Sequence, residues 1–111
     1  MRIKTNELTR AALDWAVAKC EGRQEPEVVN NFAVAWYTWP NTHYSTDWAQ
    51  GGPIIEREKL CIAYNFDDHT WEAGWDCYVK GWGDTPLIAA MRCYVASKLG
   101  DDIDIPEELT P

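Results

Sequence analysis

The stretch "TPLIAAMRCYVASKLG", Thr85–Gly100, does most to decide what kind of fold this chain can form. Thr85 is a favoured helix N-cap, Pro86 suits the first helical position, and Gly100 suits the position just past a helix end. Apolar residues recur between them at about the helical period. We therefore predict one helix between the threonine cap and the glycine.

A second helix is predicted near the start of the chain. Thr9 can cap the alanine-rich stretch "RAALDWAVAKCEG", which ends before Gly22. Its apolar stripe is broad, and the neighbours of Trp15 one turn away are also apolar. We expect Trp15 to lie in the core.

The middle of the chain has the composition of β-strands. Val28–Trp39 is rich in β-branched and aromatic residues and predicts a strand. Pro53–Phe66 predicts one long strand or two short ones. For "PIIERE", Pro53–Glu58, the alternative is a helix with Pro53 at its first position. Trp71–Trp82, interrupted by Gly74, predicts a hairpin partner. The predicted class is α+β, with two helices packed on a small antiparallel sheet.

Length and composition indicate a single globular domain over residues 1–111. The chain is 46% hydrophobic and 25% charged, and its acidic tail begins at about residue 101, where Ile103 and Ile105 can anchor it. A net charge of −8 without a Lys/Arg cluster argues against nucleic-acid binding. No apolar run approaches the length of a membrane span, so we expect no membrane partner.

Cysteine and histidine usage does not indicate a reactive centre. Cys20, Cys61, Cys77 and Cys93 form no C-x-x-C pair, and we predict reduced, mostly buried thiols in a cytoplasmic protein. The two histidines are isolated, and a metal site needs three or four convergent ligands. We therefore predict no catalytic residues, no metal and no cofactor.

The stretch "YSTDWAQGGPIIERE", Tyr44–Glu58, allows two interpretations. Ser, Thr and Asp side chains bond nearby amides and favour capped turns. Alternatively the stretch is a ligand loop, in which Asp47 accepts hydrogen bonds from ribose hydroxyls and Trp48 stacks on a base. It matches neither G-x-G-x-x-G nor the Walker pattern, which argues against those phosphate sites.

A group of aromatic residues follows in "WEAGWDCYVKGW", Trp71–Trp82. Such rings suit base stacking, worth about 1–3 kcal/mol for each base. They equally suit a homodimer interface or a core.

Three blocks of the sequence together resemble the phage NinX-like family of small accessory proteins from lambda-type phages. They are "ELTRAALDWAVAKCEG", "YSTDWAQGGPIIERE" and "GDTPLIAAMRCYVASKLGDDIDIPEEL". Arg10 stands where that family often carries Gly. The resemblance implies a phage-encoded protein that works in the bacterial cytoplasm, and it brings no established catalytic residues.

The predicted function is non-catalytic capture of a small nucleotide-derived signal of host immunity, by a homo-oligomer. Trp48 or Trp82 would stack on the base, Asp47 and Gln50 would hold ribose or base edges, and Arg57 or Arg92 would neutralise a phosphate. The candidate ligand contacts are Tyr44, Thr46, Asp47, Trp48, Gln50, Gly51, Gly52, Arg57, Trp82 and Arg92.

Two other functions remain open from the sequence. One is a protein–protein modulator that blocks a host enzyme with an acidic and aromatic surface. The other is a small hydrolase of signalling nucleotides that works through His43 or His69.

Overall fold

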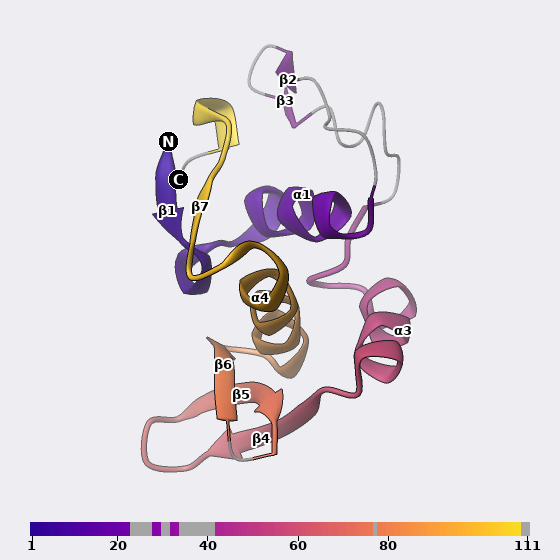
Figure 1. Cartoon of the computed structure of the whole chain (residues 1–111), viewed down its shortest axis with the longest axis vertical. Helices are drawn as coiled ribbons and strands as arrows, with labels where there is room; N and C mark the ends of the chain where they lie inside the picture. The colour runs from indigo at the N-terminus through magenta and orange to yellow at the C-terminus, as the bar shows by residue number, and fades with distance from the viewer. Residues whose placement is uncertain (23–27, 30–31, 34–41, 77, 110–111) are drawn as a thin grey trace.

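The computed structural model describes residues 1–22, 28–29, 32–33, 42–76 and 78–109 (Figure 1). Within these ranges the α-helices are α1 (Arg10–Cys20), α3 (Trp48–Glu58) and α4 (Pro86–Leu99). Two short 3-10 helices are η1 (Thr5–Glu7) and η2 (Glu107–Leu109). The strands are β1 (Arg2–Lys4), β2 (Val28–Val29), β3 (Phe32–Ala33), β4 (Cys61–Asn65), β5 (Thr70–Trp75), β6 (Tyr78–Gly83) and β7 (Asp102–Asp104).

Helix α4 forms as predicted and lies at the centre of the protein, between the three-stranded sheet and α1 (Figure 1). Thr85 Oγ1 accepts a hydrogen bond of 3.1 Å from the Ile88 amide, which caps the helix. Gly100 ends it with a φ of +95°, a backbone angle that favours glycine. The predicted apolar stripe of Leu87, Met91, Tyr94 and Val95 is buried, and burial extends beyond it to Ala89, Ala90, Cys93 and Ala96.

Strands β4, β5 and β6 form an antiparallel sheet in that order, and α4 packs directly on β6. The predicted pairing of Trp71–Trp82 with the preceding strand is confirmed for β5, which pairs with β4. Residues 71–82 hold two strands, however, and the ladder between β5 and β6 is irregular at Ala73 and Gly74. The close approach to α4 depends on glycine. A Cβ atom on Gly81 would lie 2.3 Å from the Ala89 carbonyl oxygen, and one on Gly83 would lie 2.9 Å from the Ala89 amide nitrogen.

Helix α1 also forms as predicted and packs on α4. Thr9 has the extended backbone of an N-cap, although its side chain makes no capping hydrogen bond. Trp15 is buried in the core, as expected.

The two ends of the chain lie side by side, because β1 and β7 pair antiparallel with Ile3 opposite Ile103 (Figure 1). Ile103 and Ile105 are buried, which confirms that they anchor the acidic segment. Thr5 joins the two segments, since its Oγ1 donates a 2.6 Å hydrogen bond to the Gly100 carbonyl.

The α+β class is confirmed, and two local predictions need correction. Residues 48–58 form a third helix, α3, and the strand in this region begins only at Cys61. The alternative prediction, a helix over Pro53–Glu58, is therefore closer to the structure than a strand. The observed helix nevertheless starts at Trp48, and Pro53 lies inside it. Tertiary packing outweighs the local preference of Gly and Pro, because Ile54 in this helix is buried in the core.

The predicted strand Val28–Trp39 is only partly covered by the described residues. Within it, β2 and β3 pair with each other in antiparallel fashion, so they are not one continuous strand. Residues 30–31 and 34–39 of the prediction lie outside the described residues.

Gly81→Ala is expected to lower the free energy of unfolding by about 3 kcal/mol, because the new methyl group meets backbone atoms of α4 that cannot move independently. The matched control is Gly52→Ala, where a Cβ atom meets nothing within 4 Å. This control should raise stability by about 0.5–1 kcal/mol through helix propensity. Urea unfolding measures both changes, and equal effects would contradict the packing argument.

Candidate functional site

The candidate site is a hollow of about 200 Å³ between the starts of two helices. The start of α3 carries Trp48, which is 53% exposed, and the start of α4 carries the Thr85 cap. Helix N-termini carry a partial positive charge, so the hollow combines an aromatic ring with the positive ends of two helix dipoles. The Ala49 and Ile88 amides are already bonded to the caps Asp47 and Thr85. Its lining residues are Ser45, Thr46, Trp48, Thr85, Leu87 and Ile88.

Asp47 and Gln50 form the cap of α3. The Ala49 amide donates a 2.9 Å hydrogen bond to Asp47 Oδ1, and Gln50 Nε2 donates one of 3.4 Å to Asp47 Oδ2. Gln50 Oε1 in turn accepts from the His43 amide at 2.6 Å. The capped-turn interpretation therefore describes this stretch, and both side chains hold the Trp48 end of the hollow in place.

The two glycines of the predicted loop have different surroundings inside α3. Gly51 is buried, and a Cβ atom there would lie 2.4 Å from the Tyr44 carbonyl oxygen and 2.6 Å from Leu87 Cδ1. Gly52 has open space around it. Gly51 thus allows α3 to approach Leu87 of α4, and this approach brings the two helix starts together.

Asp14 supports the floor of the site from α1. It is buried, and its Oδ1 accepts a 2.9 Å hydrogen bond from the amide of Ser45. The Ser45 hydroxyl lies close to the same carboxylate, but it has no partner in hydrogen-bonding geometry among the described residues. Burial raises the pKa of Asp14, and the hydrogen bond from the Ser45 amide opposes this rise.

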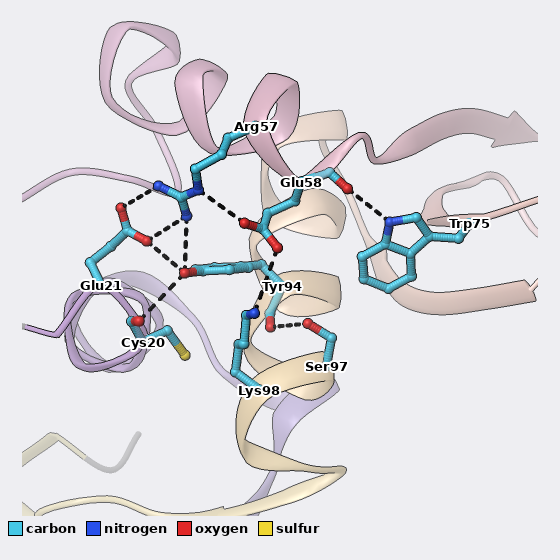
Figure 2. A network of polar contacts seen from close by, with 8 residues as sticks. All are labelled: Cys20, Glu21, Arg57, Glu58, Trp75, Tyr94, Ser97 and Lys98. Carbon is cyan, nitrogen blue, oxygen red and sulfur yellow. Dashed lines mark hydrogen bonds and ion pairs between the residues drawn. The ribbon is translucent and has the colours of Figure 1, made fainter.

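Arg57 lies at the opposite end of α3, where it joins three helices (Figure 2). Its guanidinium group donates two hydrogen bonds to Glu21, at 3.1 and 2.7 Å, and one of 2.9 Å to Glu58. It also donates to the hydroxyl of Tyr94 at 3.1 Å, and that hydroxyl donates to Glu21 at 2.6 Å. The hydrogen bonds that Arg57 donates to Glu21 are the main cause that raises the pKa of Arg57, so its charge is paired with the protein's own carboxylates.

The remaining contacts of this network fix neighbouring elements (Figure 2). Lys98 Nζ lies 3.7 Å from Glu58 Oε1, which links α4 to the end of α3. The indole of Trp75 donates a 2.9 Å hydrogen bond to the Glu58 carbonyl, which links β5 to the same point. Burial raises the pKa of Tyr94, so its hydroxyl stays protonated as a donor.

Trp82 and Arg92 lie together, away from the lining of the hollow. Arg92 donates to the Trp82 carbonyl at 2.8 Å and to the Leu8 carbonyl at 2.9 Å. Burial lowers the pKa of Arg92. Trp82 is 40% exposed. The predicted contacts thus divide into a group at the α3 start, Arg57 at its far end, and the pair Trp82 and Arg92.

Several residues of the hollow were not among the predicted contacts. Thr85 was predicted to cap a helix, but the sequence around it does not show that the start of another helix lies beside it. Asp14 does not line the hollow but holds Ser45, which does. Its signal in the sequence is the clearest, because it is an acidic residue between Leu13 and Trp15 in an apolar helix. A carboxylate in such a position needs a buried hydrogen-bond donor, and Ser45 supplies it.

The histidines and cysteines of the described ranges lie in separate elements. His43 and His69 are exposed in different turns, and Cys61 is exposed, which corrects the expectation of burial at that position. Cys93 is buried and Cys20 is partly buried, and burial raises the pKa of the Cys93 thiol to about 11. Cys77 lies outside the described residues.

The described residues hold no group of three or more His, Cys, Asp or Glu side chains that could bind a metal ion. None of their helices is both long and apolar enough to cross a membrane.

The fold and the hollow define a small α+β protein with a concave surface where two helices begin. A model of the family described as "Bacteriophage P22, NinX" matches residues 4–98. The chain belongs to this family and is accordingly a phage accessory protein, which confirms the resemblance carried by the three sequence blocks. Among curated proteins no match is found.

Tyr94→Phe is expected to lower the free energy of unfolding by about 1 kcal/mol, because Glu21 loses a donor and Arg57 loses an acceptor. The matched control is Tyr64→Phe, which keeps the edge contacts of that ring with Phe66 and Trp71. Urea unfolding of both variants makes the comparison. A loss as large in the control would show that the network contributes nothing specific.

Asp14→Asn is expected to stabilise the protein near neutral pH, because it removes a charge that burial disfavours while an oxygen still accepts from Ser45. A carboxyl group whose pKa is raised on folding weakens the folded state as the pH rises from its ordinary value of 3.8 through the raised pKa. The advantage of the variant should therefore grow over this interval and vanish below it. Unfolding curves at several pH values measure this, and a loss of stability at every pH would contradict it.

Proposed function

We propose that this protein is a non-catalytic binding protein that sequesters a small nucleotide-derived immune signal in the cytoplasm of the bacterial host. The observation that carries the proposal is the hollow at Trp48. An exposed ring there stands beside the N-terminus of α4, in a protein of a phage accessory family. A nucleotide has a base that stacks on aromatic rings and phosphates that favour helix N-termini.

The geometry changes the roles that the sequence predicted. Arg57 and Arg92 already donate to acceptors of the protein, so we assign the anionic part of the ligand to the start of α4. Trp48 lines the hollow, whereas Trp82 does not, so Trp48 is the stacking ring of the proposal. The exposed Asp47 keeps acceptor capacity for ribose hydroxyls beyond its two capping bonds.

The size of the hollow supports a shared site. Small-molecule pockets are typically about 300–1,000 Å³, and the hollow of about 200 Å³ lies below that range. It accommodates part of a nucleotide and leaves the rest exposed. A second subunit would cover the remainder, which is why the proposal includes a homo-oligomer.

The test is a capture-and-release experiment. The purified protein is incubated with a panel of cyclic dinucleotides and mononucleotide signals, separated from free ligand, and then denatured by heat. Intact nucleotide in the released fraction supports sequestration. A cleaved product shows a hydrolase, and nucleotides that stay free throughout overturn the proposal for the panel and direct the search to host proteins.

Trp48→Ala is expected to weaken nucleotide binding about 5- to 150-fold, because base stacking on an aromatic ring contributes about 1–3 kcal/mol. Trp82→Ala is the matched control, since Trp82 is also exposed but does not line the hollow. Equilibrium dialysis measures both variants, with circular dichroism as the check on folding. Capture that survives Trp48→Ala and fails in Trp82→Ala would move the site to the Trp82 surface.

A further inference from the structure

Ser45 differs from the other polar residues that line the hollow at Trp48. Only 2% of its surface is exposed, so it lies at the bottom of the hollow rather than at the rim. Its hydroxyl group is buried and has no hydrogen-bond partner among the described residues. By contrast, Thr85 Oγ1 accepts a hydrogen bond from the Ile88 amide, and Thr46 is exposed to solvent. Ser45 therefore brings to the hollow a hydroxyl group that the described part of the protein leaves unsatisfied.

The unpaired hydroxyl of Ser45 destabilises the folded protein when no ligand is present. A buried hydroxyl without a partner has lost its hydrogen bonds to water and gained none in return. A ligand in the hollow that supplies the missing hydrogen bond removes this cost. The backbone of Ser45 is held in place, because its amide donates a 2.9 Å hydrogen bond to Asp14 Oδ1. Its hydroxyl, however, can turn about a single side-chain torsion towards a ligand.

Asp14 determines which kind of ligand group suits this hydroxyl. Its buried carboxylate lies close to the Ser45 hydroxyl, so a ligand N–H is favoured there over a phosphate or carbonyl oxygen. When an N–H donates to Ser45 Oγ, the hydroxyl proton can turn towards Asp14, and both groups are satisfied together. The start of α4, on the other wall, carries a partial positive charge. The two walls together suit a ligand that has both an N–H donor and an anionic group.

We propose that Ser45 is the specificity-determining residue of the hollow, and that its hydroxyl, supported by Asp14, accepts a hydrogen bond from the exocyclic amino group of a base stacked on Trp48. The inference rests on the proposed capture of a nucleotide and states which bases are captured. Adenine, guanine and cytosine carry such a group, which projects from the ring and reaches a recessed hydroxyl. The ring N–H of uracil instead lies between two carbonyl oxygens, which the carboxylate repels.

The first test compares nucleotides that differ at this amino group. The pairs are AMP with purine riboside monophosphate, GMP with IMP, and CMP with UMP, together with the cyclic dinucleotides of adenine and guanine and their analogues without the amino group. Equilibrium dialysis should show about tenfold tighter binding of the amino nucleotide, the effect of a hydrogen bond that is otherwise left unmade. Equal or reversed binding within the pairs overturns this inference alone. A wild type that captures no nucleotide overturns the proposed function and this inference with it.

Ser45→Ala completes a double-mutant cycle with the same ligands. Loss of the hydroxyl should weaken binding of the amino nucleotide about tenfold and leave binding of its analogue unchanged, so that the variant no longer distinguishes the two. An amino group that contributes as much in Ser45→Ala as in the wild type has another partner, and this result overturns the role of Ser45.

The stability of Ser45→Ala separates ligand recognition from a structural role. Because the hydroxyl has no partner in the free protein, its removal should leave the free energy of unfolding unchanged or raise it. Urea unfolding without ligand measures this change. A clear decrease would show that the hydroxyl is already bonded within the protein, and it would overturn the inference whatever the ligand.

The matched control is Thr70→Val. It also removes a buried hydroxyl group without a partner among the described residues, but Thr70 lies in β5 and does not line the hollow. This variant should bind each nucleotide as the wild type does and keep the preference within each pair. An equal loss of preference in Thr70→Val would show that removal of a buried hydroxyl acts through the fold, and it would overturn the assignment to Ser45.

Discussion

The close contact between α4 and β6 sets the positions of the sheet and of the other two α-helices in the described residues. Gly81 and Gly83 remove the side chains that would separate the strand from the helix backbone. Helix α4 can therefore pack on the sheet with one face and on α1 with another, and most of its length is buried. Helix α3 approaches it in a similar way through Gly51, which sets the two helix starts beside each other. The hollow at Trp48 is a direct result of this packing.

The sequence predicts those helices that are marked by capping residues or by an apolar stripe of their own. The threonine and proline at the start of α4, and the glycine at its end, identify that helix closely, and α1 follows from its alanine-rich stripe. Helix α3 is different, because Gly51, Gly52 and Pro53 are residues that usually interrupt helices. It forms through the cap of Asp47 at one end and the contacts of Arg57 at the other. Those contacts involve Glu21 and Tyr94, which are 36 and 37 residues away from Arg57 and carry no local signal.

Likewise, only part of the candidate site could be predicted from local sequence. The stretch from Tyr44 to Gly52 could be singled out from its own residues, and the structure places it at one wall of the hollow. The other wall, formed by Leu87 and Ile88, depends on the packing of α3 against α4. The predicted partner of a phosphate, Arg57, instead holds three helices together. A basic residue near a glycine-rich stretch therefore indicates a ligand only when it forms no ion pair with a carboxylate of the protein.

If the hollow between the starts of α3 and α4 is a preformed ligand site, as we propose, ligand binding should change the environment of its lining residues. The most direct measurement is the amide and indole NMR spectrum of the labelled protein during titration with each nucleotide of the panel. We expect chemical-shift changes to be concentrated at the Trp48 indole and at the amides of Ser45, Thr46, Leu87 and Ile88. Changes that gather instead at Trp82 and Arg92, or an unchanged spectrum with every nucleotide, would contradict it.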